Sequence, residues 1–260
     1  MRILVCIKEV PDTTEVKIDP ETGTLIRADV PAILNPFDMY ALEAALEIKD
    51  ENSTTEVIVL SMGPPQAEKN LRETIAMGVD DVYLITDRAF AGADTWATSY
   101  TLSTAIKHIG DIDLIFAGKQ AIDGDTAQTG PGIAEWLNLP QATFVKKIDK
   151  IGEKAVVVER STETGYEVIE IQFPAVITIV KGDSEPRLPS LRGMMKAKRA
   201  EIHKLTSEFL HVDEDKIGLT GSPTQVRKIF TPEKRKGGVI WEGDPAEIAE
   251  RLVSEIEKVI

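Results

Sequence analysis

Residues 114–132 read LIFAGKQAIDGDTAQTGPG, and this stretch indicates the fold. Its first four residues are apolar and predict a buried strand. Residues 132–139 carry apolar side chains at helical spacing, so the polar segment 118–131 joins a strand to a helix. In open α/β sheets, such loops lie at the carboxyl ends of parallel strands, where ligands bind. The stretch therefore predicts an α/β fold with a ligand site in this loop.

The composition of segment 118–131 suits a nucleotide. Its glycines allow the backbone to turn sharply and to approach a ligand closely; they are Gly118, Gly124 and Gly130. Lys119 adds a positive charge, and the start of the next helix offers backbone N–H groups to anions. Neutral hydrogen-bonding side chains come from Gln120, Thr126, Gln128 and Thr129. We therefore expect contacts with ribose, phosphate or ring edges here.

Helix capping is a second interpretation of the same loop. Asp125 and Gln128 fit a capping box, with Asp125 at the N-cap and Gln128 three residues later. One loop is able to cap a helix and to bind a ligand, so composition leaves both interpretations open. Asp123 and Asp125 are spaced as expected for capping or ribose contacts rather than for an acid–base pair. The sequence identifies no catalytic residue.

The first two-thirds of the chain alternates predicted strands and helices, which is typical of a doubly wound, mostly parallel sheet. The apolar strand candidates are 3–7, 57–62, 82–85 and 114–117. Helices are predicted to begin at Asn35-Pro36-Phe37-Asp38, after 63–65 and after Gly92-Ala93-Asp94-Thr95. The loops that follow the strands should then surround one ligand at one rim of the sheet; they are 6–10, 62–65, 91–98 and 118–131.

After residue 140 the chain changes character twice. Strand-like runs at 142–148, 155–159, 167–172 and 175–180 predict antiparallel additions to the sheet. From residue 183 onward, frequent proline and glycine predict an extended arm, so we place an α/β domain at 1–182 and the arm at 183–260. The arm ends in a helix capped by Asp244, with an apolar stripe formed by Ile248, Leu252, Ile256 and Val259. Ordering such an arm costs conformational entropy, which predicts a partner surface.

Composition excludes several functional classes. The 260-residue chain has a net charge of −13, which argues against nucleic acid as a partner. Three scattered histidines without nearby ligands predict no metal site, and the single cysteine, Cys6, is typical of a reducing compartment. Phosphate-loop, dinucleotide-fingerprint and nucleophile-elbow motifs are absent. Because no apolar run approaches the roughly 18 residues of a membrane span, we expect a soluble, cytoplasmic protein.

Six motifs together resemble the β subunit of electron-transfer flavoprotein (ETF). They run from the first predicted strand to a basic segment near residue 200 and are KEVPD (8–12), NPFD (35–38), MGP (62–64), AMGVD (76–80), GKQAID (118–123) and MKAK (195–198). The resemblance implies an adenine-nucleotide-binding, HUP-like α/β fold with antiparallel additions and a C-terminal arm. It also implies a heterodimer whose α subunit holds one FAD. The terminal helix of the arm would pack on that α subunit.

In simple members of the family, this subunit binds AMP as a structural ligand. In electron-bifurcating members it binds a second FAD, which oxidises NADH and splits the electrons between the α-subunit FAD and ferredoxin or flavodoxin. Two stretches resemble the bifurcating type: GADTWAT (92–98) and DGDTAQTGP (123–131). The small side chains at Gly124 and Ala127 leave room for a pyrophosphate, and Asp94 to Thr98 opens another helix N-terminus. The resemblance therefore favours FAD over AMP.

The resemblance assigns nucleotide contacts by position. Those outside the 118–131 loop are Cys6, Asn35, Phe37, Asp38, Met62, Ala93, Asp94, Thr95 and Thr98. Those in the loop are Gly118, Lys119, Gln120, Ala121, Ile122, Asp123, Gly124, Asp125, Thr126, Ala127, Gln128 and Thr129. Thr13 replaces an aromatic residue that some relatives place against the α-bound flavin, whereas Phe37 is retained.

A short segment resembles the family's recognition loop for partner dehydrogenases. Leu191 falls at its anchoring leucine, and Arg192, Met194 and Met195 flank it. The resemblance implies a dehydrogenase of the acyl-CoA or 2-hydroxyacid type as partner. Two other hypotheses stay open: a non-bifurcating ETF β subunit with AMP, and a nucleotide-sensing α/β module without a flavin partner.

Overall fold

The computed structural model describes residues 1–12, 31–227 and 237–258. The chain forms two compact units, Met1–Arg227 and Lys228–Ile260, and each is described by itself. Two residues singled out above, Thr13 and Val259, lie outside the described residues.

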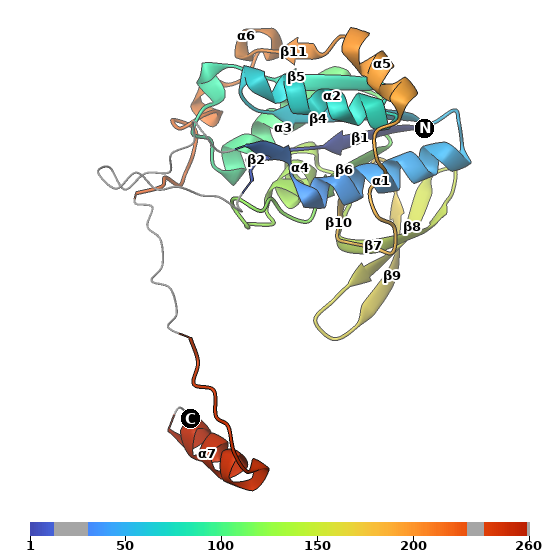
Figure 1. Ribbon diagram of the computed structural model, residues 1–260. Coiled ribbons are helices and arrows are strands. Elements are labelled where there is room, and N and C mark those ends of the chain that lie inside the picture. The colour runs from blue at the N-terminus through green and yellow to red at the C-terminus, as the bar shows by residue number, and fades with distance from the viewer. Residues whose placement is uncertain (13–30, 228–236, 259–260) are drawn as a thin grey trace. The chain divides into compact units, whose positions relative to one another are not determined.

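A mixed sheet forms the centre of the first unit (Figure 1). Among the described residues it has nine strands, in the order β11-β5-β4-β1-β6-β10-β7-β8-β9. Their bounds are β1 Arg2–Cys6, β4 Glu56–Met62, β5 Asp81–Ile85, β6 Leu114–Gly118, β7 Gln141–Ile151, β8 Ala155–Ser161, β9 Tyr166–Gln172, β10 Ala175–Ile179 and β11 His203–Leu205. A separate antiparallel pair joins β2 (Glu9–Pro11) to β3 (Ala32–Leu34).

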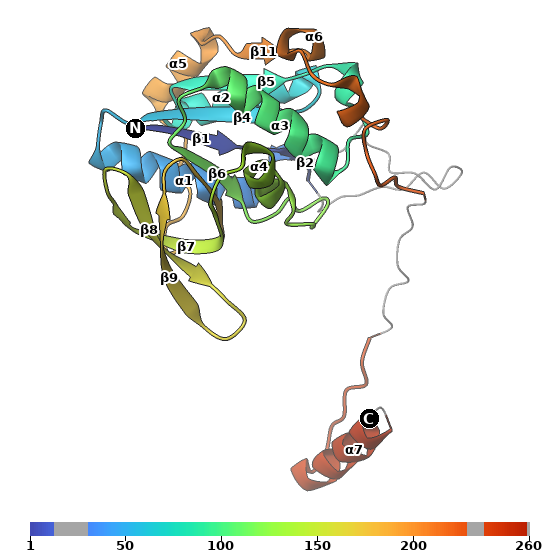
Figure 2. The same ribbon diagram turned by 180° about the vertical axis from the view of Figure 1, so that it is seen from behind.

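Both faces of the sheet are covered by helices. Helices α1 (Pro36–Glu51), α2 (Glu68–Met77) and α5 (Leu191–Arg199) lie on one face, and α3 (Thr95–Ile109) and α4 (Thr129–Leu137) on the other (Figures 1 and 2). Strand β1 shows why: Ile3 and Val5 pack into the core beside α1 and α2, while Leu4 packs into the core beside α3. A strand that is buried on both sides reads as a continuous apolar run, so the sequence signal was strong.

The strand order reverses beside β1. The chain passes from β1 through β4 to β5, and then returns to the other side of β1 to form β6. Strand β1 pairs in parallel with both β4 and β6, so their carboxyl ends lie at one rim. The crevice between the ends of β1 and β6 is the topological switch point at which open α/β sheets bind ligands.

The expected antiparallel additions are confirmed in part. Strands β7, β8 and β9 pair antiparallel. Strand β10, by contrast, lies between β6 and β7 and is parallel to both. The interpretation of 175–180 as one more antiparallel strand was wrong, because its fully buried residues belong in the middle of the sheet.

Residues 183–227 are not an arm. Strand β11 extends the sheet by pairing in parallel with β5, and the short elements α6 (Ser207–Leu210) and η4 (Glu214–Lys216) follow it. Arg187 donates to both carboxylate oxygens of the buried Glu43 on α1, at 2.8–3.0 Å. The structure therefore divides the chain after residue 227, later than the boundary expected after residue 182. Pairings over such sequence separations leave no local pattern.

The second unit contains helix α7 (Pro245–Glu257). As expected, the Asp244 side chain accepts from the Ala246 N–H at its start, at 2.8 Å. Leu252, Val253 and Ile256 are about half exposed on this helix. An apolar stripe of this kind needs a surface to cover it.

The revised boundary makes a testable difference. Leu205 on β11 is 3% exposed, so Leu205→Ala should lower the free energy of unfolding by about 2–5 kcal/mol, as for other buried leucines. Deleting 228–260 should change the unfolding of the remaining unit by less than about 1 kcal/mol. Urea denaturation followed by circular dichroism measures both. Val226→Ala, at a side chain 81% exposed, is the matched control; a Leu205→Ala variant as stable as this control would contradict the assignment.

Candidate functional site

The carboxylate of Asp38 bridges the crevice between β1 and β6. Its Oδ2 accepts from the Lys8 N–H at 2.8 Å, and its Oδ1 accepts from the Gly118 N–H at 3.0 Å. Burial raises the pKa of Asp38 from 3.8 to about 7, although these hydrogen bonds act in the opposite direction. The side chain thus joins the first turn of α1 to the ends of two strands.

Gly118 is required at the end of β6 because α1 approaches it closely. A Cβ on Gly118 would lie 2.5 Å from the Phe37 carbonyl carbon and 2.6 Å from the Asp38 nitrogen, besides contacting the Asp38 carboxylate. Gly130 similarly faces the Thr178 side chain, with no room for a Cβ. These two glycines serve backbone and side-chain packing, whereas Gly124 has open space around it.

Asn35 holds the loop that follows β6. It occupies the N-cap of α1 without capping it. Instead, its buried amide donates to the Gln120 carbonyl at 2.9 Å and accepts from the Ile122 N–H at 3.2 Å. The NPFD motif therefore shapes the site because its Asn35 side chain binds the backbone of the 118–131 loop.

A second tie holds the tip of the loop. The Lys8 ammonium contacts both oxygens of Asp123 at 2.7 Å. Asp125 accepts from the Gln120 amide instead of capping a helix. The two carboxylates therefore have separate partners.

The predicted capping box was wrong. Helix α4 begins at Thr129, with Gln128 at its N-cap, and no side chain caps it. Asp125 and Ala127 have φ angles of 54° and 52°, a left-handed conformation that the capping pattern does not anticipate. The loop thus stays irregular for three residues longer than expected.

The α3 helix joins the loop through one hydrogen bond. Thr95, the first residue of α3, donates from Oγ1 to the Gln128 Oε1 at 2.9 Å. Asp94 caps α3 as expected, accepting from the N–H groups of Trp96 and Ala97 at 3.0 and 3.1 Å. The starts of α3 and α4 are therefore adjacent at the rim.

This rim fits a nucleotide by its donor chemistry. The uncapped first turn of α4 presents backbone N–H groups, and the small residues Gly124 and Ala127 leave the tip of the loop without bulky side chains at those two positions. The Lys119 ammonium supplies a positive charge. Cys6 is buried at the end of β1 and Met62 is half-buried at the end of β4, so both lie at the same rim. The burial of Cys6 raises its pKa, so its thiol stays protonated.

One residue of the rim was missed. The Lys119 ammonium lies over the rings of Phe37 and Phe144, 5.7 and 5.6 Å from their centroids. Phe144 has a φ of 59°, which is rare for a bulky residue, and its N–H donates to the Thr178 Oγ1 at 3.1 Å. It occurs where the pairing of β7 with β10 shifts register, and only the sheet reveals that irregularity.

Comparison with known proteins identifies the family. A sequence model of the electron transfer flavoprotein domain matches residues 22–210. The chain belongs to the electron transfer flavoprotein family. It is 54% identical over 259 residues to the caffeyl-CoA reductase–Etf complex subunit CarD of Acetobacterium woodii, covering 99% of this chain and 98% of the relative. It is also 54% identical over 246 residues to the electron transfer flavoprotein subunit beta of Megasphaera elsdenii, covering 92% and 91%.

A third relative is the acryloyl-CoA reductase electron transfer subunit gamma of Anaerotignum propionicum, at 47% identity over 264 residues and 98% of each chain. The resemblance to an ETF β subunit is thus confirmed, and with it a role in electron transfer. The mixed α/β fold with its mostly parallel sheet is also confirmed.

The segment that resembles the ETF recognition loop forms α5. Leu191 and Met195 are 79% and 65% exposed, and Arg192 and Met194 are exposed beside them. Arg72 on α2 fixes the other end of α5 by donating to the carbonyls of Ala197 and Ala200 at 2.7 and 2.8 Å. The apolar residues therefore project from a helix that is held in place.

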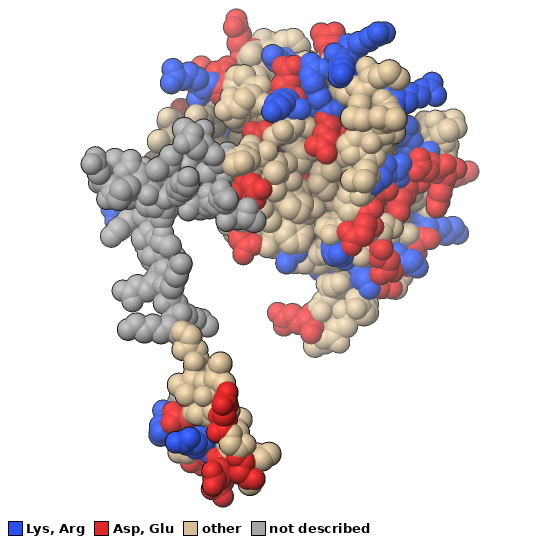
Figure 3. Space-filling model, in the orientation of Figure 1, with Lys and Arg blue, Asp and Glu red and all other residues tan. Residues whose placement is uncertain are grey.

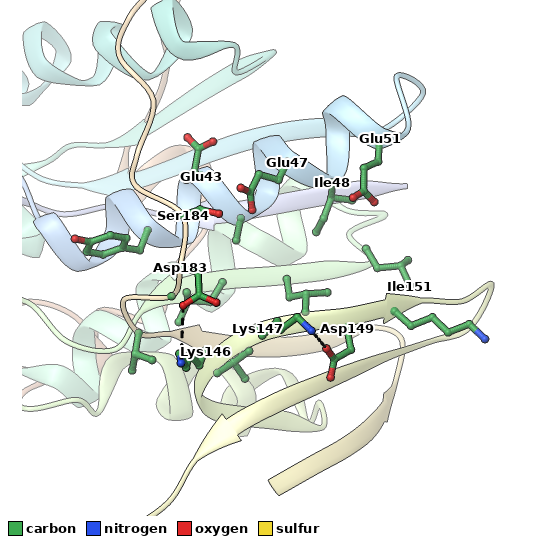
Figure 4. Close-up of a pocket in the computed structure, with 18 residues that line it drawn as sticks. Glu43, Glu47, Ile48, Glu51, Lys146, Lys147, Asp149, Ile151, Asp183 and Ser184 are labelled. Carbon is green, nitrogen blue, oxygen red and sulfur yellow. Dashed lines mark ion pairs between the residues drawn. The ribbon is translucent and has the colours of Figure 1, made fainter. Parts of the chain in front are cut away.

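A pocket of about 400 Å³ lies between α1 and β7 (Figure 4). Lys147 pairs with Asp149 at 2.6 Å and Lys146 lies 3.9 Å from Asp183, so several of its charges neutralise each other. Acidic and basic side chains are also interspersed over the visible face of the first unit (Figure 3).

In the part of the chain that the structure describes, no group of three or more His, Cys, Asp or Glu side chains is arranged to bind a metal. No helix of that part has the length and apolar character needed to cross a bilayer.

The buried Asp38 predicts a particular pH dependence. Between about pH 4 and pH 7 the folded chain retains a proton that the unfolded chain has lost, so the contribution of Asp38 to stability falls as pH rises. Asp38→Asn removes this titration. The unfolding free energy of the wild type minus that of the variant should therefore be more positive at about pH 4.5 than at pH 8, by on the order of 3 kcal/mol. Urea denaturation at both pH values tests this; a difference that does not vary with pH would refute it.

Proposed function

We propose that the chain is the β subunit of an electron-bifurcating ETF and binds FAD at the rim formed by β1, β6, α3 and α4. The hydrogen bond between Thr95 and Gln128 carries the proposal. It joins the two loops, 92–98 and 123–131, whose sequences resemble the bifurcating type. Two separate sequence signals thus meet at one site.

The chain's own residues would hold the cofactor in place. Backbone N–H groups at the start of α4 and the Lys119 ammonium suit the pyrophosphate, and Thr95, Gln128 and Thr129 suit ribose or phosphate oxygens. Asn35 and Asp38 act by fixing the loop and the strand ends. When bound, FAD supplies the chemistry: it accepts hydride from NADH and passes electrons to the α-subunit FAD and to ferredoxin or flavodoxin.

Two exposed surfaces suit the proposed partners. Leu191 and its neighbours on α5 present an apolar knob to a flavin dehydrogenase. The stripe on α7 suits the α subunit. Relatives named for caffeyl-CoA and acryloyl-CoA reductases favour an acyl-CoA dehydrogenase over the 2-hydroxyacid type. We place the complex in the cytoplasm. Family membership and the exposed Leu191 surface favour an ETF β subunit over a free-standing nucleotide sensor.

A non-bifurcating subunit with structural AMP is the alternative, and counting nucleotides separates the two. Co-expression with the α subunit should yield two FAD per heterodimer, and that heterodimer should oxidise NADH when ferredoxin and a partner dehydrogenase are supplied. The heterodimer is denatured, and the nucleotides that it releases are identified and counted as FAD or AMP by chromatography. One FAD plus one AMP, without NADH oxidation, would establish the alternative.

Substitution of Ala127 tests where FAD and AMP binding differ. Ala127→Leu adds bulk to the loop, and its side chain faces the same backbone constraint as alanine at a φ of 52°. The variant should lose the β-bound FAD but still be able to bind the smaller AMP. Ala127→Gly removes bulk and relieves the left-handed conformation, so it should retain FAD. Flavin content per heterodimer measures both. Equal FAD content in the two variants would show that bulk at this position is irrelevant.

A further inference from the structure

A polar cluster connects the end of the first unit to the rim. Ser222 is buried, and its Oγ accepts from the Asp94 N–H at 2.8 Å and donates to the Gly218 carbonyl at 2.7 Å. Thr224 donates to the Asp94 Oδ2 from both its N–H, at 3.0 Å, and its Oγ1, at 2.7 Å. These two residues come directly before the chain leaves the first unit at Arg227.

The same segment also packs closely against the loop that precedes α3. The Leu219 N–H donates to the Ala91 carbonyl at 3.0 Å. Gly218 has a φ of 56° and contacts the Ala89 carbonyl so closely that it has no space for a Cβ. Gly92, with a φ of 76°, faces the Leu219 side chain. Backbone hydrogen bonds and tight packing therefore fix 217–224 against 89–94.

Asp94 is the centre of this cluster. One carboxylate oxygen caps α3, and the other is occupied by Thr224. Burial acts to raise the pKa of Asp94, but the hydrogen bonds from Ala97 and Thr224 outweigh it and lower that pKa, so the carboxylate is ionised near neutral pH. With both oxygens engaged, Asp94 orients the first turn of α3.

The effect reaches the loop through the next residue. Thr95 follows Asp94 and binds Gln128, which precedes the uncapped first turn of α4. Ser222 and Thr224 are thus linked to Asp94 by hydrogen bonds, Asp94 to Thr95 by the chain itself, and Thr95 to Gln128 in the 118–131 loop by a further hydrogen bond.

We propose that Ser222 and Thr224 are positioning residues for the nucleotide site, which they hold in its binding arrangement through Asp94. The proposal rests on the proposed function, in which this rim binds a nucleotide and 228–260 binds the α subunit. Residues 222–224, which lie just before the end of the first unit at Arg227, would then be a structural part of the nucleotide site.

The test uses the heterodimer, stripped of β-bound nucleotide and titrated with FAD and with AMP. Thr224→Val removes the hydroxyl donor but keeps the shape and the backbone N–H, and Ser222→Ala removes the other hydroxyl. Each should weaken nucleotide binding about 5- to 10-fold, since a hydrogen bond to an ionised group or a buried partner is lost. Thr224→Ser, which keeps the hydroxyl, should bind nucleotide within about 2-fold of the wild-type affinity. The visible circular dichroism of its bound flavin should also match that of the wild type.

Thr162→Val is the matched control. Thr162 donates to the Gly165 carbonyl at 3.1 Å in the turn between β8 and β9, an exposed hydrogen bond outside the rim. It should leave nucleotide binding and the flavin spectrum unchanged. Wild-type affinity in Thr224→Val and Ser222→Ala, or failure of Thr224→Ser to restore binding, would overturn the proposal.

Amide hydrogen exchange separates this proposal from the proposed function. Thr224→Val and Ser222→Ala should speed exchange at 95–97 and 118–129 by about 5- to 10-fold, with or without ligand. Unchanged exchange there would overturn the positioning role even if the heterodimer binds FAD. A wild-type heterodimer that binds neither FAD nor AMP at this site would instead overturn the proposed function.

Discussion

The two hydrogen bonds accepted by Asp38 are the constraint on which the rim depends. The chain continues from β1 to α1 and from β6 to α4, on opposite faces of the sheet, so a gap opens between the two loops beyond the last paired residues, Cys6 and Ala117. The carboxylate spans that gap by binding one backbone N–H on each side. Its burial opposes ionisation, which shows in its raised pKa, so the bridge carries an electrostatic cost that the surrounding packing offsets.

The remaining contacts of the rim build outward from this bridge. Asn35, three residues earlier on the chain, holds the middle of the 118–131 loop, and Lys8 holds Asp123. Thr95 then joins the far end of the loop to α3. The loop is therefore fixed at its base, middle and end, while Gly124 has open space around it and Thr126 is exposed.

Much of the fold was predictable because its signals are local. The parallel strands are apolar runs, and Asn35-Pro36 and Asp94 mark helix starts by residue type. The errors share a cause: tertiary contacts decided the outcome. The three residues of β11 become a strand only by pairing with β5, and Arg187 meets Glu43 across 144 positions. Asp125 loses its capping role because the loop adopts a left-handed conformation. Phe144 was missed because its position depends on a shift in strand register.

The open surroundings of Gly124 have a consequence for which positions of the loop tolerate substitution. Gly118 and Gly130 are enclosed by packed atoms, so a change at either position disturbs folding as well as binding. Gly124, Asp125 and Thr126 are exposed by contrast, so substitutions at these three positions should disturb the core little. The tip of the loop and the packed core beneath it are thus structurally separable, and the tip can change while the core packing stays the same. Protein engineers can exchange this tip as a module and leave the scaffold intact.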